Sequence, residues 1–362
     1  MNEENPTAFS GSYDASDVTF LLKPVAIPRI DVRKKERLIQ SGAKHYSEML
    51  SPEKLPDQRY LELYQKALNL NAGRLRSHIE LLARAVIARP ETSTECVIIS
   101  LARAGTPIGV LLKRALLRMG VAVHHYSISI IRGRGIDRNA LRLIQSRHGS
   151  VSSIFVDGWT GKGAIKLELE RSLAHDPFGF RPFLAVVADP AGCADLAATL
   201  DDYVIPSGLL NGIVSGLVSR SVLTDDLVGT DDFHACAFQE EYREHDVSRD
   251  FITAIETADT QALDGGQWSP LLAHAARKQR DELMRHLLIE CGIRDINRIK
   301  PGIAEATRAV LRRVPERLFV ANRHDPEIRH LRHLAAADGI QIIERSLASY
   351  RAVTIIKSVG GE

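Results

Sequence analysis

The sequence predicts an α/β protein: a doubly wound parallel sheet with helical additions before it and a smaller α/β domain after it. Three observations lead to this fold class. Short apolar runs alternate with helix-like segments between residues 96 and 206, and this alternation is typical of a parallel sheet. A length of 362 residues favours two domains over one small core. A polar, turn-rich stretch at 259–270 precedes a second set of apolar patterns.

The elements follow in order along the first domain. Residues 1 to about 30 are expected to form a tail and an extended entry segment, followed by helical patterns at 32–50 and 60–88 with a proline-marked turn between them. The sheet strands are apolar runs, expected at 96–100, 121–130, 152–157, 182–189 and 203–206. The intervening helices are expected at 107–119, 140–148 and 164–174, with a short one near 195–200.

The second domain repeats the pattern on a smaller scale. Its helices are expected at 271–292, 300–314 and 327–339, and its strands at 316–322, 340–344 and 352–359. We therefore divide the chain into residues 1–265 and 266–362.

Composition narrows the class of protein. Hydrophobic residues at 44% and charged residues at 25% are ordinary for a soluble globular chain. No apolar run approaches the roughly 20 residues that span a bilayer, and the polar N-terminus lacks the apolar core of a secretory signal. A net charge of +2 neither demands nor excludes nucleic acid. The cysteines are scattered without a CxxC pair, which argues against disulfide or zinc frameworks and favours the cytoplasm: Cys96, Cys193, Cys236 and Cys291.

The segment SSIFVDGWTGKGAI is the strongest candidate for a site. An apolar strand ends in Asp157 and turns through glycines into a helix. Bare N–H groups, the helix dipole and the Thr160 hydroxyl can surround a phosphate, and Lys162 adds a positive charge. Asp157 can bind a ribose hydroxyl or Mg²⁺. The segment therefore favours a phosphorylated sugar, with an ordinary strand-to-helix turn as the alternative. Its candidate binding residues are Gly158, Thr160, Gly161, Lys162 and Gly163.

Two further loops are candidates for phosphate contacts. In LARAGTP, Arg103 offers a bidentate fork, Gly105 next to Ala104 allows close backbone approach, and Thr106 can cap the following helix. The segment IIRGRGIDRNA carries Arg132, Arg134 and Arg138 with glycines between them, which suits a lid closing over a polyphosphate. A capped turn and a solvated basic loop are the respective alternatives.

The Asp157 segment resembles the phosphoribosyl pyrophosphate (PRPP) loop of type I phosphoribosyltransferases. That family runs an apolar strand into two adjacent acids and then Thr-Gly-Gly-Thr; here the run is Thr160 to Gly163. This chain departs from the family in having Gly158 at the second acid and a shorter spacer before Thr160. The resemblance implies a phosphoribosyltransferase-like sheet, with the pyrophosphate loop at Arg103 to Thr106 and Mg²⁺ as cofactor.

Five segments together resemble a bacterial family found with tellurium-resistance and stress operons. They are QSGAKHYSEML, SLARAGTP, FVDGWTGKGAI, IPSGLLNGIVSGLVSR and KPGIAEATRAVLRRVP. The family is described as a phosphoribosyltransferase-like domain followed by a Pelota-type RNA-binding domain, and it also carries the label cysteine protease StiP. The resemblance implies a basic RNA-facing surface at Arg294, Arg298, Lys300, Arg308, Arg312, Arg313 and Arg317.

Three functional hypotheses follow. The leading one is a Mg²⁺-dependent phosphoribosyltransferase-like enzyme in which a nucleophile attacks C1 of PRPP and pyrophosphate leaves; Asp157 and Arg103 would be its catalytic residues. The second is a non-catalytic protein that binds a nucleotide and RNA. The third is a cysteine protease, for which Cys193 is the one cysteine expected on an exposed turn. We expect a homodimer and no membrane partner.

Overall fold

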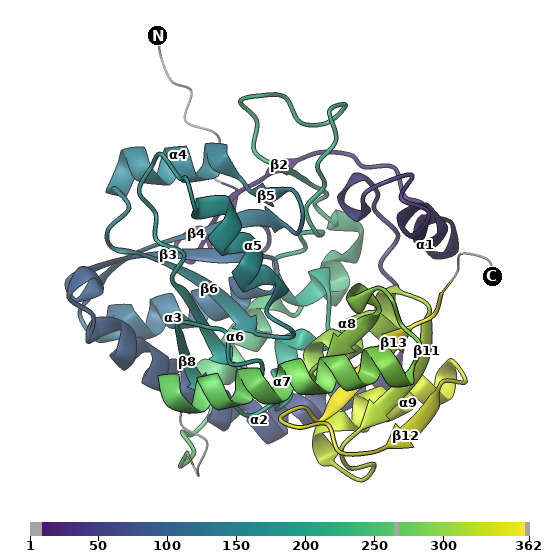
Figure 1. Cartoon of the computed structure of the whole chain (residues 1–362). Helices are drawn as coiled ribbons and strands as arrows, with labels where there is room; N and C mark the ends of the chain where they lie inside the picture. Colours follow the sequence, from purple (N-terminus) through teal and green to yellow (C-terminus); the bar gives the residue numbers. More distant parts are fainter. Residues whose placement is uncertain (1–8, 264–267, 359–362) are drawn as a thin grey trace.

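The computed structural model describes residues 9–263 and 268–358 and confirms the α/β fold class (Figure 1). The expected boundary at 265/266 and the start of the tail lie outside the described residues. The main sheet has the order β1-β4-β3-β6-β7-β8; these neighbours are parallel, and β5 pairs with β4 in the antiparallel sense. Its strands are β1 (Thr19–Leu21), β3 (Glu95–Ala102), β4 (Ala122–Ile131), β5 (Gly135–Ile136), β6 (Ser153–Trp159), β7 (Leu184–Ala188) and β8 (Leu196–Thr199).

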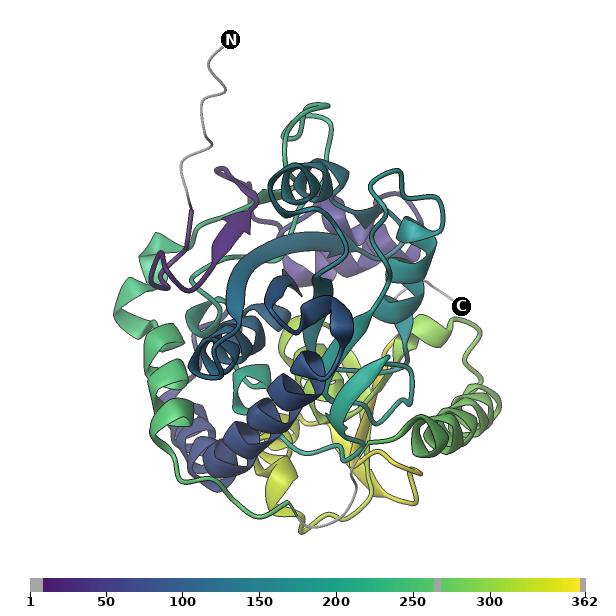
Figure 2. The ribbon, with the colours of Figure 1, turned by 90° about the vertical axis from the view of Figure 1, so that its left-hand side faces the viewer.

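Helices cover both faces of this sheet (Figures 1 and 2). The alternation of side chains along β3 shows why: Ile98 joins the core under α2 (Gln58–Ile87), α3 (Gly105–Arg118) and α6 (Ser248–Thr257). Val97 and Ile99 point the other way, into the core under α4 (Arg138–His148) and α5 (Ala164–Leu173). A strand buried on both faces reads as a continuous apolar run, as CVIIS does.

Smaller elements complete the first domain. They are β2 (Lys23–Pro24), which pairs with β9 (Ala235–Cys236), helix α1 (Val32–Gln40), and the 3₁₀ helices η1 (Tyr46–Glu48), η2 (Pro90–Thr92), η3 (Pro206–Gly208), η4 (Gly212–Val214) and η5 (Glu240–His245).

The C-terminal domain has its own sheet, of order β10-β13-β11-β12. Helix α7 (Pro270–Glu290) covers one face through Leu283 and Leu287. The other face carries α8 (Ile303–Arg312) and α9 (Arg329–Ala337), whose apolar residues belong to the same continuous core as α2 and α3. The remaining elements are η6 (Ile296–Arg298), β10 (Ile299–Pro301), β11 (Pro315–Val320), η7 (Pro326–Ile328), β12 (Gln341–Glu344) and β13 (Ala352–Ile356). None of the helices in the described ranges is both long and apolar enough to cross a membrane.

Three local predictions are wrong. The last strand of the sheet is β8, where a short helix was expected, because pairing with β7 overrides the helix preference of its alanines. Residues 203–206, expected as a strand, are buried without strand pairing, and Pro206 begins η3. The helix expected at 32–50 ends at Gln40. The entry segment, expected to be extended, contributes the edge strand β1.

Asp202 ties the two domains together. Its carboxylate accepts hydrogen bonds from the backbone N–H of Ile303, at the start of α8, at 3.0 Å and of Arg351 at 2.8 Å. The Arg351 guanidinium then pairs with Asp201 at 3.0 Å and Asp325 at 2.6 Å. The first domain therefore supplies the acceptor that fixes where α8 begins.

Replacing Asp202 by alanine should destabilise the whole chain. Both N–H donors would stay buried without an acceptor, at a cost of about 2 to 4 kcal/mol in the free energy of unfolding. Urea unfolding measures this. Asp231→Ala is the matched control, since its side chain is 90% exposed and should change stability by less than about 0.5 kcal/mol. Equal stability of the two variants would contradict the assignment.

Candidate functional site: a basic cleft between the two domains

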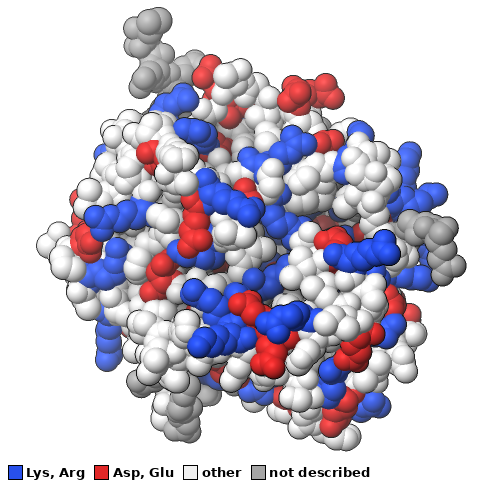
Figure 3. All heavy atoms as spheres, viewed as in Figure 1, with Lys and Arg blue, Asp and Glu red and all other residues white. Residues whose placement is uncertain are grey.

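A cleft of about 1570 Å³ lies where the carboxyl ends of β3, β4 and β6 meet the C-terminal domain. This is the edge at which ligands bind in open α/β sheets. Figure 3 shows lysine and arginine side chains gathered around the hollow in the middle of this face. The volume exceeds that of most small-molecule sites, so the cleft has room for a nucleotide or a short nucleic-acid segment.

Basic side chains far outnumber acidic ones in the cleft wall. The basic residues are Lys35, Lys44, Arg103, Arg132, Arg134, Lys162, Lys166, Arg171, Arg220, Arg294, Arg298, Lys300, Arg308, Arg312 and Arg313. The acidic residues are Glu48, Asp157, Glu168, Asp295 and Glu305. Like charges at close range destabilise one another, so this wall favours an anionic ligand.

Some of these cations are held by buried acids behind the wall. Arg103 pairs with Glu53 and donates to the carbonyl of Val218 at 2.7 Å. Burial alone would raise the pKa of the Glu53 carboxyl, but Arg103 and the other nearby guanidinium groups hold it at about 2. Arg313 forms a bidentate pair with Glu36, both contacts at 2.6 Å. These pairs fix the positions of the arginines without neutralising the cleft as a whole.

Other cations have incomplete partners. In the part of the chain that the structure describes, the Arg308 guanidinium has no hydrogen bond or ion pair and lies 4.5 Å from the centre of the Trp159 ring. The Nε of Arg312 and the Nη1 of Arg220 are also buried without a hydrogen-bond partner there. Because buried polar groups in folded proteins are normally paired, these cleft-lining donors are available to an anionic ligand.

Three lysines of the cleft wall have lowered pKa values, which means that the site disfavours their positive charge. Burial lowers the pKa of Lys162 to about 7 and that of Lys35 to about 7, and neighbouring cations add to both shifts. Burial likewise lowers the pKa of Lys300 to about 8. A bound anion would reverse these shifts, because an opposite charge favours the protonated form.

The loop after β6 meets the sequence prediction only in part. Thr160, expected at a phosphate, is buried, and its hydroxyl donates to Asp189 at 2.6 Å. The backbone N–H groups of Gly161, Lys162 and Gly163 have no partner within the described chain, and these residues line the cleft. Lys162 Nζ donates to the Ile296 carbonyl at 2.7 Å. The loop therefore offers amides to an anion, but not its hydroxyl.

Asp157 lines the cleft at the end of β6. Its carboxylate accepts from the Gly158 N–H at 2.7 Å. Burial raises the pKa of Asp157 to about 7 despite the nearby Arg308. Asp189 does not replace the acid missing at Gly158, because it is fully buried behind Thr160.

The loop after β3 brings Arg103 and Ala104 to the cleft but not the next two residues. Gly105 packs on β6: a Cβ there would lie 2.3 Å from the Val156 carbonyl oxygen. Thr106 is buried, with its hydroxyl 2.8 Å from Ser127 Oγ, so its expected capping and ligand roles are wrong. The Ala102–Arg103 peptide bond is cis.

The turn that carries Arg132 and Arg134 is a fixed wall of the cleft, whereas we expected a mobile lid. Glu168 on α5 accepts from the N–H groups of Gly133 at 2.7 Å and Gly135 at 3.0 Å. Tyr46 Oη accepts from the Arg132 N–H at 2.9 Å, and the Arg134 side chain pairs with Glu48 at 2.7 Å. Glu168 was missed from sequence because a glutamate in an amphipathic helix looks like a solvated one.

Cys193 also lines the cleft, but not on the exposed turn that we expected. It is 8% exposed, and burial raises the pKa of its thiol to about 12. The groups that act on it electrostatically are Asp189, Arg280 and Arg277; no histidine is among them. Activation of a thiol nucleophile needs a neighbouring base, and among the described residues no hydrogen bond joins Cys193 to a histidine.

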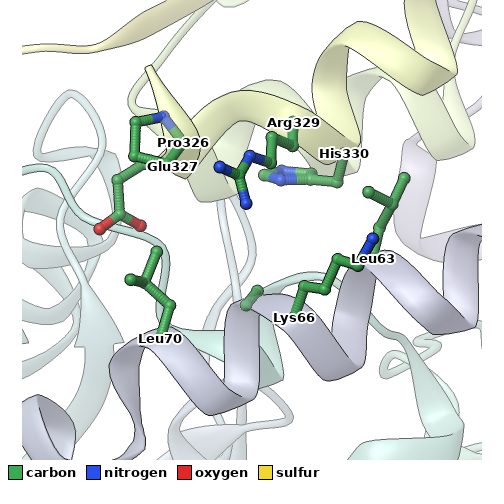
Figure 4. Close-up of a pocket in the computed structure, with 8 residues that line it drawn as sticks. Leu63, Lys66, Leu70, Pro326, Glu327, Arg329 and His330 are labelled. Carbon is green, nitrogen blue, oxygen red and sulfur yellow. The ribbon is translucent and has the colours of Figure 1, made fainter. Parts of the chain in front are cut away.

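A second, much smaller hollow lies where α2 meets η7 and α9 (Figure 4). Leu63, Lys66 and Leu70 approach it from α2, and Glu327 and His330 from the C-terminal domain. Its volume of about 10 Å³ holds at most one water molecule, so it is a packing gap in the domain contact.

Solved structures similar to this chain are phosphoribosyltransferases, at low similarity. Hypoxanthine phosphoribosyltransferase from Trypanosoma cruzi, in complex with the product IMP, gives a TM-score of 0.29 at 15% identity over 35% of this chain and 75% of that chain. HGPRT-ase from Leishmania tarentolae in complex with GMP gives 0.26 at 12% identity over 35% and 78%. Scores this low carry no argument about function.

Whole-chain similarity is far stronger. The family model described as "Tellurite-like stress resistance cysteine protease StiP" matches residues 11–256, and the "PELOTA RNA binding domain" model matches residues 278–358. Cysteine protease StiP of Acinetobacter baylyi is 43% identical over 366 residues, covering 97% of this chain and 95% of that protein. These names favour the protease hypothesis over the transferase hypothesis, and they confirm the resemblance drawn from the sequence. The chain belongs to the StiP family of tellurite-like stress resistance proteins and carries a Pelota-type RNA-binding domain at its C-terminal end.

Proposed function

We propose that the cleft binds a multiply phosphorylated sugar of the PRPP class and that the protein is a phosphoribosyltransferase-like enzyme. The observation that carries this proposal is a set of three half-buried arginines in the cleft wall, each with a buried nitrogen that has no hydrogen-bond partner in the described part of the chain: Arg220, Arg308 and Arg312. Guanidinium groups are the preferred partners of phosphate, and a desolvated site strengthens each contact.

Different residues of the cleft bind the terminal phosphate, the ribose and the pyrophosphate of the ligand. The free N–H groups of Gly161 to Gly163 and the Lys162 ammonium hold the terminal phosphate. Asp157 receives a ribose hydroxyl, and Arg308 with Arg312 neutralises the pyrophosphate. An acceptor nucleophile forms a bond to C1 while the C1–O bond to pyrophosphate breaks, and the leaving group takes the electron pair. Positioning and charge neutralisation supply the catalysis.

Magnesium fits this site poorly as a protein-bound ion. Asp157 stands beside Arg308, its pKa is raised, and glycine occupies the neighbouring position where the second acid would stand. Among the described residues, no group of three metal-binding side chains includes Asp157. We therefore propose Mg²⁺ only as a counter-ion that the ligand's phosphates bring, which is a common mode for this ion.

We propose RNA as the partner of the C-terminal domain. The PRPP hypothesis and the RNA hypothesis both place their ligand in the cleft. Most of the arginines expected on an RNA-facing surface line the cleft, including Arg294, Arg298 and Arg308; Arg317 instead pairs with Glu316. In the non-catalytic alternative, an RNA segment or a nucleotide binds here without pyrophosphate release. The homodimer and the cytoplasmic location stay predictions.

Cysteine proteolysis is the second candidate function, and the name of the Acinetobacter relative favours it. Cys193 is the cysteine that such a function would use, because it lines the cleft. Its thiol would have to be exposed and deprotonated by a change in structure, since burial raises its pKa to about 12.

PRPP should raise the melting temperature of the wild type and have no effect on Arg308→Met. Ligand at 100 times its Kd adds about 2.7 kcal/mol to the free energy of unfolding. Methionine preserves the packing on Trp159 but removes the charge. Arg332→Met, an exposed site on α9, is the control and should respond like the wild type.

The pattern of ligands separates the hypotheses. No shift with millimolar PRPP would overturn the proposal. A shift without pyrophosphate release in the presence of candidate acceptors would favour the non-catalytic protein, and displacement of PRPP by a single-stranded RNA would place both ligands in one cleft.

Asp157→Asn should flatten the pH dependence of stability. The carboxyl has a pKa of about 7 when folded and an ordinary one of 3.8 when unfolded, so the folded state holds the proton more tightly. Its contribution to stability is therefore greatest below about pH 4, declines as the pH rises to 7, and is constant above that. Urea unfolding at pH 5 and pH 8 measures the difference. Identical pH profiles for the wild type and Asp157→Asn would contradict the burial of this carboxyl, and Asp231→Asn is the exposed control.

Cys193→Ala should leave any peptidase activity of the purified protein unchanged. A buried thiol is a weak nucleophile, so Cys193 should react with iodoacetamide at pH 7 more slowly than Cys291, which is more exposed although burial raises the pKa of its thiol too. Peptide hydrolysis and mass spectrometry of the alkylated protein measure the two effects. Loss of hydrolysis in Cys193→Ala, but not in Cys291→Ala, would establish the protease.

A further inference from the structure

Glu95, His124 and His148 form a cluster of metal-binding side chains outside the cleft. One ligand atom from each lies within 4.8 Å of the other two. The cluster sits at the start of β3 and β4, at the edge of the sheet opposite the one where the cleft opens. The function proposed above does not use it.

The fold brings these three side chains together on one face. Val97 is the register partner of His124, so Glu95, two residues before Val97, projects from the same face as His124. His148 arrives from the last turn of α4, which packs on that face. Its ring stacks on the His124 ring with 4.0 Å between centres, and its Nδ1 lies 4.0 Å from Glu95 Oε1.

A second residue already orients one of the ligands. His148 Nε2 forms a 2.8 Å hydrogen bond with Tyr126 Oη, and Tyr126 is two residues after His124 on the same face of β4. If Nε2 donates its proton to the tyrosine, Nδ1 is left with a free lone pair facing Glu95. Histidines that bind metals are commonly held in this way through their other ring nitrogen.

We propose that Glu95, His124 and His148 bind a divalent first-row transition ion of the zinc class. Two imidazoles with one carboxylate are a set that suits such ions better than Mg²⁺ or Ca²⁺. Bonds of about 2.1 Å around a tetrahedral ion place ligand atoms roughly 3.4 Å apart. The ligand atoms now lie within 4.8 Å of one another, so the cluster must close by up to about 1.4 Å. Because an imidazole lone pair lies in the plane of its ring, the His124 ring must turn out of its stack on His148 for both to face one ion. Glu95 has a 47% exposed side chain and His124 is exposed, so both have room to rotate, and a water molecule completes the coordination.

The ion would fasten the end of α4 to β3 and β4. Its binding is coupled to folding, because the three ligands come from separate elements that only the folded chain brings together. It makes no contact with the cleft, so its test does not depend on the ligand proposed there.

The test uses full-length protein stripped with a chelator and returned to chelator-free buffer. Isothermal titration with ZnCl₂ should show one saturable site per chain, and Zn²⁺ should raise the melting temperature while MgCl₂ does not. Glu95→Gln and His124→Asn change exposed side chains and should each weaken binding by at least about tenfold. Tyr126→Phe, which leaves the ligands in place, should weaken it by roughly tenfold.

His274→Ala is the matched control, since His274 is exposed on α7 and lies outside the cluster. It should bind Zn²⁺ like the wild type. Cobalt provides a second readout: Co²⁺ bound to the cluster should give visible absorption bands that Glu95→Gln and His124→Asn lose. No saturable zinc binding in the wild type, or unchanged binding in both ligand variants, would overturn the proposal.

Discussion

The packing of α8 against the carboxyl edge of the main sheet is the contact on which the rest of the structure depends. It buries Arg308 and Arg312 beside the loops that end β3 and β6. Asp202 fixes the start of the helix, and the apolar face of α8 shares its core with the first domain. The cleft therefore belongs to neither domain alone, and a ligand in it contacts both.

The electrostatics of the cleft follow from this packing. Buried acids at Glu36 and Glu53 hold Arg313 and Arg103 in place, but they leave the other cations with too few counter-charges. Burying like charges together is unfavourable, and this lowers the pKa values of Lys35 and other wall lysines. A bound anion would relieve this repulsion, so the cleft favours an anionic ligand. The same wall disfavours a protein-bound divalent cation.

The family name favours a cysteine protease, whereas the side chains of the cleft favour the binding of a phosphorylated ligand. Similarity over nearly the whole chain links it to proteins named as cysteine proteases, while Cys193 is buried, burial raises the pKa of its thiol, and no histidine in the described ranges is hydrogen-bonded to it. The arginines that line the same cleft are suited to phosphate contacts. A fold supports many chemistries, and the arrangement of side chains in the site decides which one operates.

The sequence by itself determined the α/β class, the order of the two domains and the position of the glycine-rich turn after β6. Apolar periodicity and the spacing of glycines are local properties of the chain, so they can be read without the fold. It did not reveal that Thr160 bonds Asp189, that Glu168 accepts hydrogen bonds from the Arg132 turn, or that helix α8 of the C-terminal domain would supply arginines to the cleft. These contacts join residues distant in sequence, and only the tertiary structure decides them. Strand β8 was missed for the same reason, since its conformation is set by pairing with β7 and not by its own composition.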